Sequence, residues 1–138
     1  MGTKLDITCI QSINLFNRIT GIKAQFCFNY ASSLIFIVSP ENFNAAIGER
    51  GNNLRRLGIT FKKRIKIVAA PTPDKINRFV KAVVSPVRFN KLTVENGEVS
   101  IKAGPQAKAS LIGRNHANLD QLQDILKYYF KTRSLRIV

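Results

Sequence analysis

The sequence predicts an α+β fold in which one small unit of helices and strands occurs twice. Two similar segments, at 47–54 and 112–119, lie 65 positions apart, and each carries a glycine turn. Around each segment, stretches with the apolar spacing of a helix and stretches with the apolar alternation of a strand follow one another in the same order. The apolar content of 45%, with nine Phe, is enough for a core in each of two small units.

The first half of the chain, residues 1–70, is predicted to fold as one domain. Its first helix has apolar residues at every third position, a capping box of Thr8 with Gln11, and Gly21 at its end. Aromatic and β-branched segments then predict a hairpin, and Ser39-Pro40 is typical of a helix start. The predicted elements are a helix at 8–20, strands at 24–30 and 34–38, a short helix at 40–47, a second short helix that holds Leu54 and Leu57, and a strand at 65–69.

The second half, residues 71–138, is predicted to repeat this order as a second domain. Thr72-Pro73 is expected to begin a helix whose apolar residues recur at i, i+3, i+4 and i+7. Asn96-Gly97 is a strong hairpin signal, and Gly104-Pro105 starts the short helix before the second glycine turn. The predicted elements are a helix through Ile76 and Val83, strands at 87–95 and 98–103, a helix ending at Ile112, a helix from Leu119 to Tyr129, and a strand at 135–138.

The charge of the chain predicts a polyanionic partner. There are 22 Lys and Arg against 8 Asp and Glu, which gives a formal net charge of +14. The segment up to Ala70 has 10 basic and 3 acidic residues and the remainder has 12 and 5, so each half carries +7. If the charge came from a basic tail on a neutral domain, one half of the chain would carry most of it. We therefore expect both halves to bind the same kind of polyanion. A basic surface without a partner is the plainer alternative.

Composition also excludes several classes of protein. No apolar run approaches the roughly 20 residues of a membrane span, and the N-terminus lacks a signal-peptide pattern, so no membrane partner is expected. Cys9 and Cys27 are neither spaced as metal ligands nor numerous enough for a disulfide framework. We therefore expect both to be small buried hydrophobic residues and the protein to be cytoplasmic. Without a catalytic or metal-binding cluster or a Walker loop, we expect no enzyme activity, no metal and no cofactor.

Each glycine turn is a candidate phosphate site. Residues 47–54 read Ile-Gly-Glu-Arg-Gly-Asn-Asn-Leu, and residues 112–119 read Ile-Gly-Arg-Asn-His-Ala-Asn-Leu. Glycine lets a bulky anion approach the backbone, and a helix that begins after the turn adds free N–H groups. A tight turn between helices is the alternative for one copy, but two copies in matching surroundings favour a function.

The order helix, strand, strand, helix, helix, strand, with Ile-Gly-x-x-Gly between the last two helices, resembles a type II KH domain. Two such units in tandem are similar to the archaeal NusA family of transcription factors over essentially all 138 residues. The resemblance implies that the chain binds single-stranded RNA and takes part in transcription termination or antitermination. It also implies RNA polymerase as a partner, either indirectly or through a surface that the sequence does not identify. A ribosome-associated structural or assembly factor that binds rRNA is the alternative.

The resemblance further implies which residues of the first unit contact RNA, since KH loops clamp about four nucleotides. Gly48 and Gly51 would admit the backbone of the RNA, and Arg50 would pair with a phosphate. Ile47 and Leu54 would form an apolar floor for bases, although ordinary helix core is an equal alternative for Leu54. The basic residues could equally form a solvated face. The full predicted set is Ile47, Gly48, Glu49, Arg50, Gly51, Asn52, Leu54, Arg55, Lys62 and Lys63.

The second turn departs from the pattern because His116 replaces its second glycine. A Cβ at this position is expected to obstruct the closest approach to the backbone. His116 could stack on a base or bond to a phosphate, or it could be an exposed loop residue without a special task. We therefore rank the first turn above the second. The predicted residues of the second unit are Lys108, Ile112, Gly113, Arg114, Asn115 and His116, with Arg133 as a further flanking charge.

Overall fold

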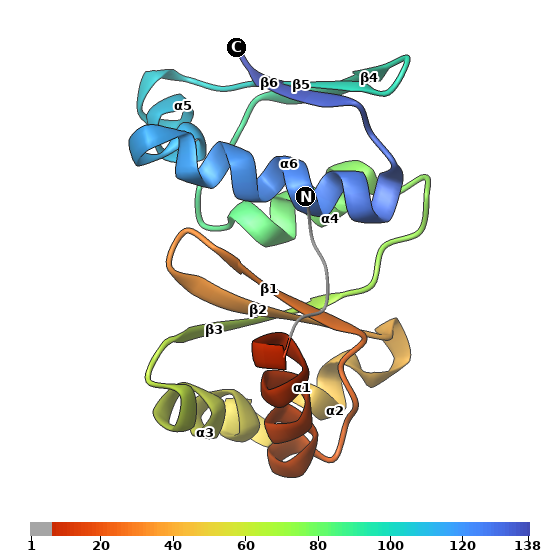
Figure 1. The fold of residues 1–138 in the computed structure, drawn as a ribbon, viewed down its shortest axis with the longest axis vertical. Coiled ribbons are helices and arrows are strands. Elements are labelled where there is room, and N and C mark those ends of the chain that lie inside the picture. Colours follow the sequence, from red (N-terminus) through yellow and green to blue (C-terminus); the bar gives the residue numbers. More distant parts are fainter. Residues whose placement is uncertain (1–6) are drawn as a thin grey trace. The chain divides into compact units, whose positions relative to one another are not determined.

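The computed structural model describes residues 7–138, and it contains two compact units that divide between Ala70 and Pro71. Each unit has a three-stranded sheet with its helices on one face, in the order α-β-β-α-α-β (Figure 1). The predicted α+β class and the duplicated order of elements are therefore confirmed.

The first unit has the mixed sheet order β1-β2-β3. Strand β2 pairs antiparallel with β1 and parallel with β3. The parallel pair requires a crossover connection, and the two helices α2 and α3 provide it. The elements are α1 (Ile7–Thr20), β1 (Phe26–Tyr30), β2 (Ser33–Val38), η1 (Pro40–Asn42), α2 (Phe43–Ile47), η2 (Glu49–Gly51), α3 (Asn52–Phe61) and β3 (Arg64–Ala69).

An apolar layer joins these helices to the sheet. Side chains alternate along a strand, so Leu34, Phe36 and Val38 of β2 share the face that meets the helices. Phe16 of α1 stacks on Phe36 with ring centroids 4.4 Å apart, and Leu57 of α3 is fully buried. This layer fixes the ends of α2 and α3, and it thereby positions the turn between them.

Cys9 and Cys27 lie within the same layer, and both are buried, as the sequence predicts. Their Sγ atoms are 2.9 Å apart, and the Cys9 thiol donates to the Cys27 carbonyl oxygen at 3.3 Å. The two thiols therefore link α1 to β1 in addition to filling space.

The second unit repeats the architecture with sheet order β4-β5-β6. Strand β5 pairs antiparallel with β4 and parallel with β6. Its buried residues include Phe79 and Val83 from α4 and Leu122 and Leu126 from α6. The elements are α4 (Ile76–Val84), β4 (Lys91–Glu95), β5 (Glu98–Lys102), α5 (Pro105–Ile112), η3 (Arg114–His116), α6 (Ala117–Phe130) and β6 (Ser134–Ile137).

Two predicted helix caps are wrong. Thr8 lies inside α1 because the helix already includes Ile7. Thr72 does not cap α4, which begins at Ile76. The Thr72 hydroxyl donates instead to the Asp74 carboxylate at 2.7 Å, in the turn before the helix.

One predicted strand is too long. The segment 87–95 was expected to be extended throughout, but β4 begins only at Lys91. The Val87 N–H donates to the Val84 carbonyl at 3.0 Å, so the chain turns after α4 before it joins the sheet. The hairpin prediction at Asn96-Gly97 is confirmed, with positive φ at both residues (52° and 79°).

The lengths of the helices and the placement of possible metal ligands bear on function. Within residues 7–138, no helix is both long enough and apolar enough to cross a membrane. Over the same residues, no group of three His, Cys, Asp or Glu side chains could hold a metal ion.

Thr132, in the turn after α6, carries a buried hydroxyl that has no hydrogen-bond partner in the described part of the chain. Replacing Thr132 by Val keeps the shape and removes the desolvation cost of the hydroxyl. The free energy of unfolding is therefore expected to rise by about 1 kcal/mol. Urea unfolding measures the change, with the exposed Thr72→Val variant, which loses its bond to Asp74, as a control that should not rise. A less stable Thr132→Val variant would show that the hydroxyl is satisfied.

Candidate nucleic-acid interface

The first glycine turn, Gly48–Gly51, reverses the chain between α2 and α3. Gly48, Arg50 and Gly51 all have positive φ (82°, 55° and 72°). The Gly51 N–H donates to the Gly48 carbonyl at 3.1 Å, and the Asn52 N–H donates to the Glu49 carbonyl. These two N–H groups are thus used inside the turn. The positive end of the α3 dipole and the exposed Arg50 side chain remain to attract a phosphate.

The two glycines of this turn have different roles. Gly48 has φ 82° and ψ 167°, a combination that side chains disfavour, and a Cβ there would lie 2.9 Å from the Asn53 backbone nitrogen. Gly51 has φ 72° and ψ 20°, and a Cβ there would meet only the Arg55 Nη1 atom, at 3.9 Å. Gly48 is therefore needed to form the turn, whereas Gly51 leaves the outer side of the turn open.

Two side chains hold the turn in place. The Asn53 Nδ2 group donates to the Ala45 carbonyl at 3.2 Å and so ties the start of α3 to α2. The Arg55 Nη1 group donates to the Arg50 carbonyl at 2.8 Å. The predicted site omitted Asn53. The sequence did carry a signal for it, because Asn-Leu recurs at 53–54 and 118–119 in the two repeats.

The second turn, Gly113–His116, follows the same backbone course without a second glycine. Asn115 has φ 55° and ψ 31°, close to the 55° and 29° of Arg50. His116 has φ 62° and ψ 20°, in the left-handed region that Asn and His enter more readily than most residues. The Asn118 Nδ2 group donates to the Ser110 carbonyl at 2.9 Å, as Asn53 does in the first unit. The shape of the turn therefore survives the loss of the glycine.

The charges around the two turns differ more than their backbones. Residues 48–56 contain Glu49, Arg50, Arg55 and Arg56, a formal charge of +2. The corresponding residues 113–121 contain one Arg and one Asp, a formal charge of zero. Asp120 occupies the position that Arg55 has in the first repeat, and it is exposed in the first turn of α6. A phosphate would therefore be attracted more strongly to the first turn.

The remaining predicted residues of the first unit fall into two places. Ile47 and Leu54 flank the turn, half-buried against the core of the unit. Lys62 and Lys63 follow the far end of α3, a ten-residue helix about 15 Å long. The Lys63 ammonium donates to the Asn29 side chain of β1 at 3.3 Å. The two lysines are thus exposed but are not brought to the turn.

The predicted residues of the second unit divide in the same way. Lys108 lies one helical turn before Ile112 on the same side of α5, so it flanks the second glycine turn. Arg133 follows α6, whose 14 residues span about 21 Å. The Arg133 N–H donates to the Gly97 carbonyl at 2.6 Å, which places Arg133 at the hairpin turn instead.

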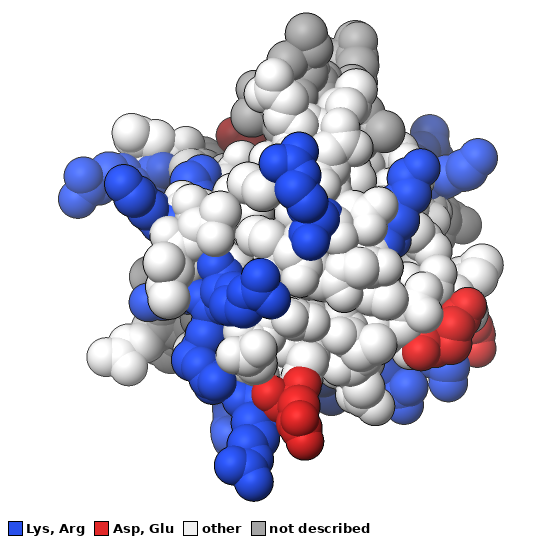
Figure 2. All heavy atoms as spheres, turned by 90° about the horizontal axis from the view of Figure 1, so that it is seen from below, with Lys and Arg blue, Asp and Glu red and all other residues white. Residues whose placement is uncertain are grey.

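The surface of the molecule reflects its excess of basic residues. Figure 2 shows one face, on which Lys and Arg side chains clearly outnumber Asp and Glu. In the first unit, exposed basic side chains lie at both ends of α3. They are Arg50, Arg55, Arg56, Lys62, Lys63 and Arg64.

The duplicated αββααβ unit, with an Ile-Gly turn between its last two helices in each copy, defines a protein with tandem KH domains. In KH domains this turn clamps single-stranded nucleic acid. A solved structure has a similar fold: a crystal structure of APE1850 matches 97% of this chain and 100% of its own, with 26% identity and a TM-score of 0.65.

Sequence comparison finds relatives that carry a functional name. The chain is 24% identical to the probable transcription termination protein NusA of Methanococcus vannielii, covering all of this chain and 81% of the relative. It is also 24% identical to that of Methanocaldococcus jannaschii (94% and 72%) and 22% identical to that of Halobacterium salinarum (99% and 99%). No model of a protein family matches the chain. In sequence the chain is thus similar to the archaeal NusA proteins over nearly its whole length.

Proposed function

We propose that the chain binds single-stranded RNA at the first glycine turn and takes part in transcription termination or antitermination. The observation that carries the proposal is the first turn itself, where Arg50 and the open Gly51 lie at the start of α3 within a basic segment. The names of the relatives, each a probable transcription termination protein, support the role in transcription. Residues 1–70 and 71–138 are each proposed to form one KH domain.

The binding mode follows from the charges and apolar surfaces beside the turn. The guanidinium of Arg50 pairs with a phosphate, helped by the positive end of the α3 dipole. The accessible parts of Ile47 and Leu54 contact the bases. Because neither contact reads a base edge, this mode tolerates many sequences. It involves no catalytic step, no metal and no cofactor.

The transcription role adds RNA polymerase as a second partner in the proposal, since the polymerase extrudes the nascent RNA. The same clamp could serve a ribosome-associated factor that binds rRNA. The names of the relatives favour transcription over the ribosome. Capture of RNA polymerase by the immobilised protein supports the first role, whereas cosedimentation with ribosomal subunits alone would support the second.

Titration with labelled nucleic acids at several salt concentrations tests RNA binding. We expect single-stranded RNA to bind more tightly than duplex, with a slope of log affinity against log salt of about −0.7 for each phosphate neutralised. Single-stranded DNA of the same sequence tests the preference for RNA. Equal affinity for single strand and duplex would contradict the clamp and indicate general adhesion to a basic surface.

A further inference from the structure

A hollow in the second unit combines basic and aromatic side chains, and no residue of the second glycine turn lines it. It has a volume of about 460 Å³ and is lined by Lys81 and Ser85 at the end of α4 and by the segment 86–89 before β4. Strand β4 is one edge of its sheet and β6 is the other, and α5, which leads into the glycine turn, packs on β6. The residues that line the hollow are thus distinct from those of the second glycine turn.

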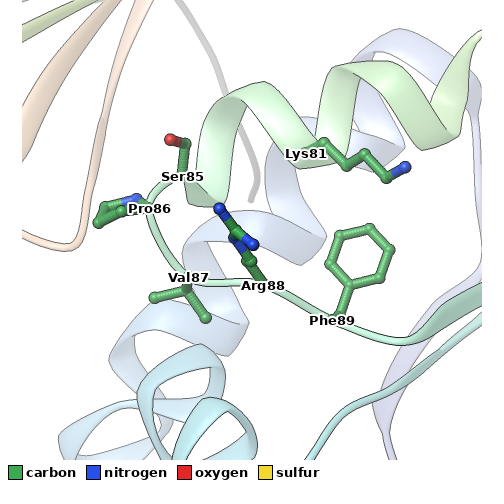
Figure 3. Close-up of a pocket in the computed structure, with 6 residues that line it drawn as sticks. All are labelled: Lys81, Ser85, Pro86, Val87, Arg88 and Phe89. Carbon is green, nitrogen blue, oxygen red and sulfur yellow. The ribbon is translucent and has the colours of Figure 1, made fainter.

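Three side chains give this hollow its chemistry. Lys81 and Arg88 are exposed, and Phe89 is half-buried, so its ring is anchored by the fold while part of it remains accessible. Figure 3 shows the Phe89 ring pointing toward α4, below the Lys81 side chain, with the Arg88 guanidinium directed to the same side of the segment. The ring and both cations therefore belong to the lining of one hollow.

The segment of the chain that forms the hollow is basic. The sequence has no Asp or Glu between Asp74 and Glu95, and it places five basic residues there. These residues are Lys75, Arg78, Lys81, Arg88 and Lys91. Within residues 7–138, neither Lys81 nor Arg88 forms an ion pair that would neutralise it. Both cations are therefore available to an anionic ligand.

A nucleotide fits this combination better than a simple anion does. An aromatic ring offers a stacking platform to any base, and flanking cations neutralise the phosphates on either side. The volume also lies in the range of small-ligand sites. We propose that this hollow, here called the Phe89 hollow, holds one nucleotide of single-stranded RNA, with its base against Phe89 and its phosphates near Lys81 and Arg88.

The Phe89 hollow would give the second unit an RNA contact that its neutral glycine turn lacks. This inference rests on the proposed function, because it adds a second contact for the same RNA. The two contacts differ in the length of RNA they require. A fragment of about four nucleotides fills the first glycine turn alone, whereas a longer RNA of about 20 nucleotides offers further nucleotides to the Phe89 hollow.

The test compares the double variant Lys81→Glu, Arg88→Glu with the matched variant Lys127→Glu, Arg136→Glu, which changes the charge of the same unit equally at exposed positions. We expect the first variant to weaken binding of the longer RNA by about tenfold and the matched variant to weaken it by less than about threefold. Neither variant is expected to change binding of the short RNA appreciably. Equal losses in the two variants would overturn the inference.

Two variants of Phe89 test the stacking contact. Phe89→Leu is expected to weaken binding of the longer RNA, and Phe89→Tyr, which keeps the ring, is expected to retain it. Retained affinity in a folded Phe89→Leu variant would overturn the stacking contact.

Failure of the wild-type protein to bind either RNA would refute the proposed function itself. Short-RNA binding that persists while the Phe89 hollow variants match their controls would refute the hollow alone.

Discussion

Replacing Arg50 by Asp is expected to weaken binding of a short single-stranded RNA by about 10- to 100-fold. A hydrogen bond to a charged group contributes about 1.5–3 kcal/mol, and each 1.4 kcal/mol is a factor of ten in affinity. The new carboxylate also repels the phosphate. Asp tolerates positive φ well, so the turn should keep its shape at this position, where φ is 55°. Fluorescence anisotropy of a labelled RNA measures the change.

The matched control is Asn115→Asp, at the equivalent position of the second turn. Asn115 has the same φ of 55° as Arg50 and is also exposed, so the substitution adds a carboxylate in the same geometry. We expect less than about a threefold loss for the short RNA, because the second turn lacks the basic setting of the first. If both variants lose affinity equally, the RNA does not distinguish the two turns and the assignment of the clamp is wrong.

The second large effect is expected at Gly48, where Ala should lower the free energy of unfolding by roughly 2–4 kcal/mol. The substitution forces a side chain into a backbone conformation with φ 82° and ψ 167°. It also places a Cβ 2.9 Å from the backbone nitrogen of Asn53, which cannot move without shifting the start of α3. RNA binding should fall as well, because the turn must change shape. Urea unfolding and RNA titration measure the two losses.

Gly51→Ala provides the contrast within the same turn. Its left-handed conformation costs a residue with a Cβ about 1–2 kcal/mol, and the nearest atom to that Cβ would be 3.9 Å away. His116 already occupies the equivalent conformation in the second turn. A loss of stability at Gly51 as large as that at Gly48 would show that the contact with Asn53 does not distinguish the two positions.

The order of elements could be predicted because its signals are local. Hydrophobic periodicity marks the helices, and Asn96-Gly97 defines its hairpin through the backbone preferences of two residues. The errors occur where a short turn competes with the expected helix or strand. The Thr72 hydroxyl bonds to Asp74 instead of capping a helix, and the turn at Val87 delays β4. Neither contact leaves a periodic pattern in the sequence.

The candidate site shows the same division. The glycine turns and the missing second glycine could be read directly from the two repeats. The amide of Asn53 was missed because its partner, the Ala45 carbonyl, comes close only when α2 and α3 fold back on each other. The separation of Lys62 and Lys63 from the turn follows from the length of α3, which the sequence did not define. The Phe89 hollow depends on the course that residues 85–89 take beside the end of α4, which no periodic pattern marks.

The central claim is that the first glycine turn is the RNA clamp. Titration of isotope-labelled protein with a short single-stranded RNA, followed through the backbone amide resonances, tests it most directly. The account predicts that the largest shifts fall in residues 47–56 and that residues 112–121 shift little. Shifts that fall mainly in residues 112–121, or that spread over the basic surface and leave residues 47–56 unchanged, would contradict it.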